Sequence, residues 1–189
     1  PKYLRPFLYS FEKCKQLILK VDKDKSQRLR SKLIDKRFNK LVGISWTSKS
    51  EKFPTSLMSL KKMISGIYSP GMRFINLQYG DVKEEIKNVI TNLGVEILYI
   101  DELDYFNDID GLAALISACD EVVTIDNVTA NLSGALGVNT KVILPTNSYW
   151  PYGVKDKQSY WFPSIKIFRQ IKSKDWSTPL NEIRKELIK

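Results

Sequence analysis

The sequence contains no histidine at all. This absence excludes serine–histidine–aspartate and cysteine–histidine nucleophilic sites, and it excludes metal centres with histidine ligands. Acid–base chemistry would have to come from carboxylates, lysine or tyrosine, or from a part of the protein outside these 189 residues. We therefore assign no catalytic base from the sequence, and we predict no metal site and no bound cofactor.

Cysteine and long apolar runs are also scarce. Cys14 and Cys119 are the two cysteines, and no CxxC pair is present. This usage favours a reduced setting, so we expect a cytoplasmic location. No secretory signal is visible, and the longest apolar stretches, such as residues 111–119, are far shorter than a membrane-spanning helix. We therefore expect no transmembrane segment.

Positive charge is concentrated at the start of the chain. Residues 1–40 contain 13 lysines and arginines against four aspartates and glutamates, whereas residues 41–189 contain 17 of each. The first residue is Pro1 rather than methionine. We interpret residues 1–40 as a basic, mainly helical connector from a missing N-terminal half, and residues 41–189 as the folded domain. Because no nucleic-acid-binding motif accompanies the basic residues, we expect no nucleic-acid partner.

Strand and helix patterns alternate along the domain. Residues 121–145 are typical of a β-branched strand, a turn, a helix of small residues and a second strand that ends at Pro145. The same alternation before this unit predicts a Rossmann-like three-layer α/β/α fold with a mainly parallel sheet of about six strands. The predicted strands are residues 41–46, 73–79, 95–100, 121–125, 141–144 and 165–169. The predicted helices are residues 8–21, 26–38, 56–67 (with Thr55 as its cap), 82–93, 111–119, 129–136 and 178–188.

Polar residues follow several predicted strands, and in such folds ligands bind at the carboxyl edge of the sheet. Asp126 and Asn127 precede a predicted helix, whose free N–H groups and positive dipole end suit a phosphate. Residues 47–49 follow the first strand, and Gln78 lies at the end of the second. For each of these residues a structural interpretation stays open: a helix cap, a solvated loop or a polar strand end.

Two other groups of residues have structural and functional interpretations. The acidic residues between Asp101 and Asp110 do not have the spacing of a calcium loop, so we expect Asp108 or Asp110 to cap the next helix. The aromatic residues of segment 149–162 could stack on a base or sugar, or they could pack the loop against the sheet.

Several motifs together resemble one family. They are LVGISW at 41–46, FINLQYGD at 74–81, DIDGLAALISACDEVVTIDNVTANLSGALG at 108–137, KVILP at 141–145 and WFPSIKIFRQ at 161–170. In this order they resemble the C-terminal, donor-binding half of GT-B-type glycosyltransferases. The resemblance is strongest to the heptosyltransferase-like domain that follows tetratricopeptide repeats in bacterial proteins.

This resemblance implies transfer of a sugar from a nucleoside diphosphate sugar, which is a substrate and not a cofactor. It also implies a partner N-terminal half, with tetratricopeptide repeats in the related proteins. The family has threonine and histidine where this chain has Asn127 and Asn131. The alternative, a non-catalytic binding or scaffold module with a degenerate nucleotide site, therefore stays open. The implied donor-site residues are Thr47, Ser48, Lys49, Gln78, Asp126, Asn127, Thr129 and Asn131.

Overall fold

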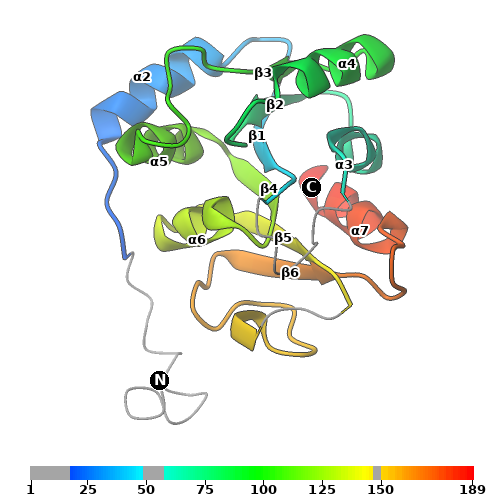
Figure 1. Ribbon diagram of the computed structural model, residues 1–189. Coiled ribbons are helices and arrows are strands. Elements are labelled where there is room, and N and C mark those ends of the chain that lie inside the picture. Colours follow the sequence, from blue (N-terminus) through cyan, green and yellow to red (C-terminus); the bar gives the residue numbers. More distant parts are fainter. Residues whose placement is uncertain (1–17, 49–57, 147–149) are drawn as a thin grey trace.

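The sheet consists of parallel strands in the order β3-β2-β1-β4-β5-β6 (Figure 1). The computed structural model describes residues 18–48, 58–146 and 150–189. The strands of the described residues are β1 (Lys40–Ser45), β2 (Met72–Asn76), β3 (Ile97–Leu98), β4 (Glu121–Ile125), β5 (Thr140–Leu144) and β6 (Ile165–Arg169). The helices are α2 (Lys23–Leu33), α3 (Leu60–Ile67), α4 (Lys83–Leu93), α5 (Ile109–Ala118), α6 (Val128–Ala135) and α7 (Ser177–Leu187), with the 3-10 turn η1 at Trp150–Tyr152.

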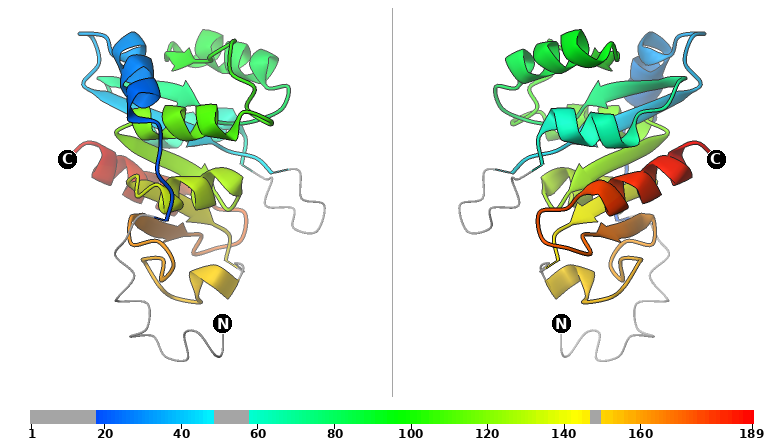
Figure 2. Two further views of the ribbon diagram at one scale, coloured as in Figure 1. Left: turned by 90° about the vertical axis from the view of Figure 1, so that its left-hand side faces the viewer. Right: turned by 90° about the vertical axis from the view of Figure 1, so that its right-hand side faces the viewer.

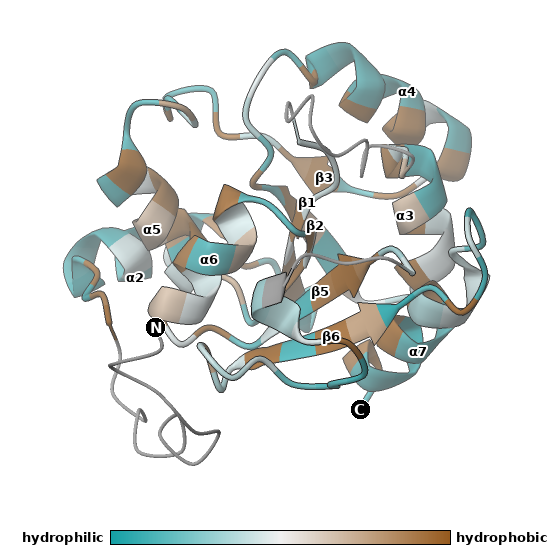
Figure 3. Ribbon diagram, turned by 60° about the horizontal axis from the view of Figure 1, so that its bottom comes forward, coloured by the Kyte–Doolittle hydropathy of each residue, from teal (hydrophilic) through white to brown (hydrophobic). Residues whose placement is uncertain are grey.

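Helices cover both faces of the sheet (Figure 2). One hydrophobic cluster joins α3, α4 and α7 to the sheet, and a second joins α2, α5 and α6 to its other face. Every residue of β2, β4 and β5 is buried, as expected for parallel strands between two helical layers. Figure 3 shows the hydrophobic residues concentrated on the strands and on the inner sides of the helices. The predicted three-layer Rossmann-like α/β fold is confirmed.

Most predicted strand positions are confirmed, and three strands end earlier than predicted: β1 by one residue, at Ser45, and β2 and β3 by more. The prediction that the second strand reaches Tyr79 is wrong, because β2 ends at Asn76. There the Asn76 side chain accepts a hydrogen bond from Gln78 N at 3.2 Å and donates one to Gln78 O at 3.0 Å, which closes a local turn. The third strand, predicted to reach Ile100, is confined to Ile97–Leu98; Ile100 N donates to the Tyr105 hydroxyl instead.

Helix boundaries also differ in places. The helix after β1 begins at Leu60 with Ser59 as its cap, whereas the predicted cap Thr55 lies outside the described residues. Helix α2 begins three residues earlier than predicted because Asp22 caps it through Lys25 N, and it ends at Leu33. The α4 boundaries were predicted within one residue, since Gly94 ends this helix in a left-handed conformation with φ +63°.

The segment before β1 contacts the domain. Leu33 is buried, and Arg30 donates hydrogen bonds of 2.7 Å to Ala118 O and to Asp120. Ile18 N and Leu19 N both donate to Ala135 O, at 3.1 and 3.0 Å, at the C-terminal end of α6. Most of the predicted helix at residues 8–21 lies outside the described residues. The domain boundary at residue 40 stays a prediction.

None of the helices in the described segments is both long and apolar enough to cross a bilayer.

Candidate functional site

A chain of hydrogen bonds joins the carboxyl ends of β1, β2 and β4. Gln78 Oε1 accepts three hydrogen bonds: from Ser45 Oγ at 2.8 Å, from Trp46 N at 3.1 Å and from Thr47 N at 3.0 Å. Gln78 itself is 1% exposed. The structure therefore brings the predicted residues Gln78 and Thr47 together, and it shows that the Gln78 amide fixes the backbone of the loop that follows β1.

Asn127 extends this network to the start of α6. Its Nδ2 donates to Ser45 Oγ at 2.8 Å and to Thr47 O at 3.3 Å. Its Oδ1 accepts from Thr124 Oγ1 at 3.0 Å and from Ala130 N at 3.3 Å, which makes Asn127 the N-cap of α6. A carboxylate offers only acceptors, whereas this position needs a donor toward β1 and an acceptor toward the helix, and an amide supplies both.

The first turn of α6 presents few side chains to solvent. Val128 and Thr129 are the first two residues of the helix, so their N–H groups have no intrahelical acceptor. Val128 is 50% exposed, whereas Thr129 is fully buried and its hydroxyl has no hydrogen-bond partner among the described residues. Asn131 is exposed and donates to Asn127 O at 3.2 Å. Of the predicted side chains on α6, only Asn131 is therefore accessible.

Asp126 faces a different partner. Its Oδ1 accepts a 3.1 Å hydrogen bond from the hydroxyl of Tyr152 in η1. Burial raises the pKa of Asp126, and the Tyr152 hydrogen bond lowers it in part. Burial also raises the pKa of Tyr152, and the Asp126 carboxylate raises it further, so the phenol keeps its proton and acts as the donor. Asp126 is thus a half-buried carboxyl group with a fixed orientation, and it immediately precedes the N-cap of α6.

The remaining predicted residues lie on the loop after β1. Thr47 and Ser48 are half-buried, and Thr47 belongs to the hydrogen-bond network through its backbone. Lys49 lies outside the described residues.

Three residues of this edge were missed by the sequence analysis. Ser45 links Asn127 to Gln78, Tyr152 binds Asp126, and Arg169 donates to the backbone of η1. Ser45 is a polar residue at the last position of an apolar strand, which is a signal that could have identified it. Tyr152 belonged to the aromatic loop, but no feature of the sequence selected it among its aromatic neighbours.

The acidic residues between β3 and α5 have structural partners. Asp108 caps α5 by accepting a 2.7 Å hydrogen bond from Gly111 N, and it lies 3.4 Å from Lys25 Nζ. Asp104 accepts hydrogen bonds from Phe106 N and Asn107 N. In the part of the chain that the structure describes, no three acidic or thiol side chains are grouped to hold a metal ion.

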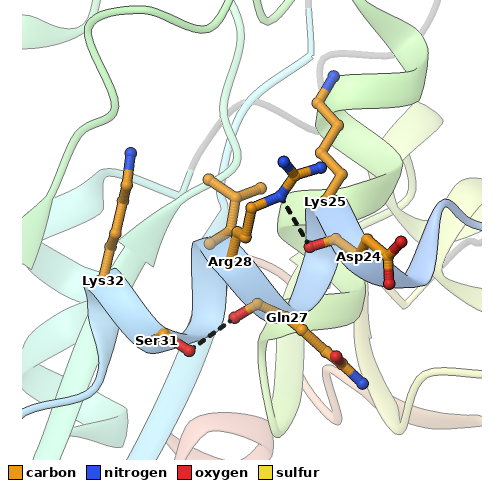
Figure 4. A pocket seen from close by; sticks show the side chains of 7 residues that line it. Asp24, Lys25, Gln27, Arg28, Ser31 and Lys32 are labelled. Atoms are coloured by element: carbon orange, nitrogen blue, oxygen red, sulfur yellow. Dashed lines mark hydrogen bonds between the residues drawn. The ribbon is translucent and has the colours of Figure 1, made fainter.

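Two hollows lie elsewhere on the described surface, and no predicted site residue lines either of them. One, of about 840 Å³, runs along α2, where Lys25, Arg28 and Lys32 project on one side of the helix and Gln27 on the other (Figure 4). The second, of about 260 Å³, lies between α4 and β3 and is lined by residues such as Ile90 and Tyr99. Neither hollow changes the candidate site at the carboxyl edge.

Comparison with curated proteins finds a partial match in sequence. The chain is similar to protein FlbA of Caulobacter vibrioides, with 38% identity over 102 residues, which cover 54% of this chain and 17% of that protein. No family model matches the chain. This chain therefore corresponds to only a small part of the curated relative that it matches.

Several solved structures with a similar fold are glycosyltransferases. The E. coli ADP-heptose LPS heptosyltransferase II matches with a TM-score of 0.64 and 14% identity, over 90% of this chain and 52% of that one. A family 9 glycosyl transferase from Veillonella parvula matches with a TM-score of 0.57 and 13% identity, over 90% and 51%. The E. coli heptosyltransferase WaaC with ADP-2-deoxy-2-fluoro heptose matches with a TM-score of 0.54 and 17% identity, over 86% of this chain and 46% of that one. The chain thus has the α/β fold found in about half of each glycosyltransferase.

Proposed function

We propose that this chain is the donor-binding half of a glycosyltransferase that transfers a sugar from a nucleoside diphosphate sugar. The observation that carries the proposal is the Asn127 network, which holds the first turn of α6 where β1, β2 and β4 end. This is the edge at which parallel α/β folds bind ligands, and a helix start favours phosphate. Two of the heptosyltransferase structures that share the fold are complexes with ADP compounds, so ADP is the first probe to use.

In this proposal the first turn of α6 lies against the diphosphate. Val128 and Thr129 supply N–H groups, and Asn131 supplies an exposed amide donor. Thr47, Ser48 and Lys49 face the diphosphate from the loop after β1, while Asp126 and Asn127 border it at the helix start. Gln78 lies near the nucleotide and holds that loop in place. The N–H groups of Val128 and Thr129, the amide of Asn131 and the ammonium group of Lys49 then stabilise the charge of the leaving diphosphate without a metal ion.

The acceptor and the general base come, in this proposal, from an N-terminal half that precedes residue 1. The proposal includes tetratricopeptide repeats in that half and a bacterial source, as the resemblance implies, and a cytoplasmic location, as the cysteine usage indicates. The basic segment that ends at Lys40 would connect the two halves.

The alternative function is a binding or scaffold module without catalysis. The specific observation in its favour is that the side-chain amides of Gln78 and Asn127 already make hydrogen bonds within the chain. Asn131 also cannot carry the positive charge that a histidine could bring to a phosphate.

The experiment is thermal unfolding of the 189-residue chain with ADP, UDP, GDP, dTDP and CMP. A nucleotide at about 100 times its dissociation constant adds roughly 2.7 kcal/mol to the stability. For a domain of this size that is a rise in Tm of about 5–10 °C. We expect one nucleotide to produce this rise in the wild type and a much smaller one in Asn131→Ala.

Asn92→Ala is the matched control. Asn92 is an exposed residue of α4 whose Nδ2 donates to the carbonyl four residues earlier, as that of Asn131 does. Loss of the response in both variants would point to a general helix effect. A flat response of the wild type to all five nucleotides would favour the scaffold alternative.

A further inference from the structure

The turn η1 is held from two sides. On one side, the Tyr152 hydroxyl donates to Asp126 Oδ1, at the start of α6, at 3.1 Å. On the other, Arg169 Nη2 donates to Tyr152 O at 2.6 Å and to Gly153 O at 3.1 Å, from the end of β6. The turn after β4, η1 and the end of β6 therefore meet at one point of the carboxyl edge.

The phenol ring of Tyr152 has a fixed position. It is 4% exposed, and it belongs to the hydrophobic cluster formed by β5, β6 and α6, with members such as Ala130, Leu144 and Ile167. Because the ring cannot move without disturbing this cluster, its hydroxyl defines where the Asp126 carboxyl group lies. Rotation of Asp126 away from this position would leave a buried phenol without its acceptor.

Arg169 fixes the backbone that carries the ring. Both hydrogen bonds come from one nitrogen, Nη2, whose two N–H groups can each donate to one of the two neighbouring carbonyls. Gly153 adopts φ +64°, and an added Cβ would meet Asp156 Oδ2 at 1.9 Å. The turn is thus restricted at consecutive residues, by hydrogen bonds at Tyr152 and by conformation at Gly153.

We propose that Tyr152 and Arg169 are positioning residues of the donor site: Arg169 fixes the turn, and the Tyr152 hydroxyl fixes the Asp126 carboxylate beside the first turn of α6. The proposal rests on the proposed function, because it gives the orientation of Asp126 a role in ligand binding. Without that role, the same contacts would only close the loop between β5 and β6.

The test uses Tyr152→Phe in the 189-residue chain, which removes the hydroxyl and keeps the ring. Tyr160→Phe is the matched control, because Tyr160 lies in the same loop and donates its hydroxyl to Asp156 at 2.5 Å instead. The first readout is the pKa of Asp126 in the ligand-free chain, measured by ¹³C NMR of the carboxyl group. The second is the dissociation constant of ADP, measured by calorimetry.

We expect Tyr152→Phe to raise the pKa of Asp126, because the lost hydrogen bond had favoured the carboxylate. We also expect about a fivefold weaker affinity for ADP, because a carboxyl group that is free to rotate must be ordered when the ligand binds. Tyr160→Phe should change neither quantity. Arg169→Met removes both of these donors, so it should move both quantities in the direction of Tyr152→Phe and speed amide hydrogen exchange at residues 152–154.

An unchanged Asp126 pKa in Tyr152→Phe would overturn the proposal. So would a raised pKa with an unchanged affinity for ADP, since the contact would then be structural only. If the wild type does not bind ADP, the proposed binding of ADP is wrong, and so is the proposed role of the Asp126 orientation in that binding. The pKa shift would still report separately whether Tyr152 orients Asp126.

Discussion

The indole of Trp46 donates a 3.0 Å hydrogen bond from Nε1 to Glu85 Oε2. Trp46 follows β1 and is 1% exposed, whereas Glu85 lies in the first turn of α4. The other oxygen of the same carboxylate accepts from Leu60 N, the first N–H of α3, at 3.0 Å. One side chain on α4 therefore binds residues on both sides of the segment that leads from β1 to α3.

The first prediction concerns this carboxylate. Glu85→Ala leaves the buried Trp46 Nε1 and the Leu60 N–H without their acceptor, so we expect a loss of about 1–3 kcal/mol of unfolding free energy. Urea unfolding measures it. Glu84→Ala is the control, because Glu84 is an exposed acidic residue of the same first turn. Equal losses in the two variants would show that helix electrostatics, and not the Trp46 contact, account for the effect.

The second prediction concerns Gln78. Gln78→Leu keeps the size of the side chain but removes the acceptor for Ser45 Oγ and for two backbone N–H groups. We expect a destabilisation of about 2–4 kcal/mol, since several buried donors lose their partner together. Gln27→Leu on the exposed face of α2 should stay within about 0.5 kcal/mol of the wild type in the same urea experiment. A small effect of Gln78→Leu would mean that water replaces the lost acceptor.

The third prediction concerns pH and Lys141, which is 1% exposed and forms an ion pair with Glu121. Burial is the largest cause that lowers the pKa of Lys141 to about 8; the charge of Glu186 raises it in part, and the nearby Lys166 and Lys40 lower it. The unfolded chain therefore holds this proton more tightly than the folded chain between about pH 8 and pH 10.5. The unfolding free energy therefore rises with pH across this range, and this gain is lost as the pH falls back to about 8.

Lys141→Met should remove this dependence. Between pH 8 and pH 10 the wild type should gain stability relative to the variant, by at most about 1.4 kcal/mol per pH unit. Glu121 keeps Lys40 as its partner at 2.9 Å, so the variant should still fold. Lys87→Met is the control, because Lys87 is an exposed lysine of α4. Parallel stability curves for wild type and Lys141→Met would contradict the lowered pKa.

The fourth prediction separates stability from binding at Asp126. Burial raises the pKa of this carboxyl group, so the stability that it contributes is present at low pH and is lost as the pH rises through its folded-state pKa. Asp126→Asn removes that loss. We expect the variant to be at least as stable as the wild type at pH 7 and to show a smaller rise in Tm with ADP. A variant that is less stable than the wild type at pH 7 and shows the same rise in Tm with ADP would contradict both expectations.

The sequence was sufficient for elements whose signal is local. The β-branched run of β4 and the boundaries of β6 match the prediction residue for residue, because buried parallel strands are continuous apolar runs between turn residues. The end of β2 was missed, since the turn there depends on one asparagine, Asn76, that bonds to the backbone two residues later. An apolar pattern carries no information about such a contact.

The candidate site was predictable only in part. The edge of the sheet and the start of α6 followed from the strand–helix order, but spacing alone could not decide between Asp126 and Asn127 as the cap, because both residue types accept from a helix N–H. The deciding contacts come from Ser45 and Thr47, which are 82 and 80 residues away in sequence. The Tyr152–Asp126 bond spans 26 residues and likewise requires the folded arrangement of β4 and η1.

The two hydrogen bonds from Ile18 N and Leu19 N to Ala135 O have a mechanical consequence. They attach the incoming chain to the last residue of the helix whose first turn borders the candidate site. A helix of eight residues is about 12 Å long and is stiff along its axis. A displacement of the backbone at residues 18 and 19 must therefore either break both bonds or shift the end of α6, and with it the position of Asn127 and Asn131.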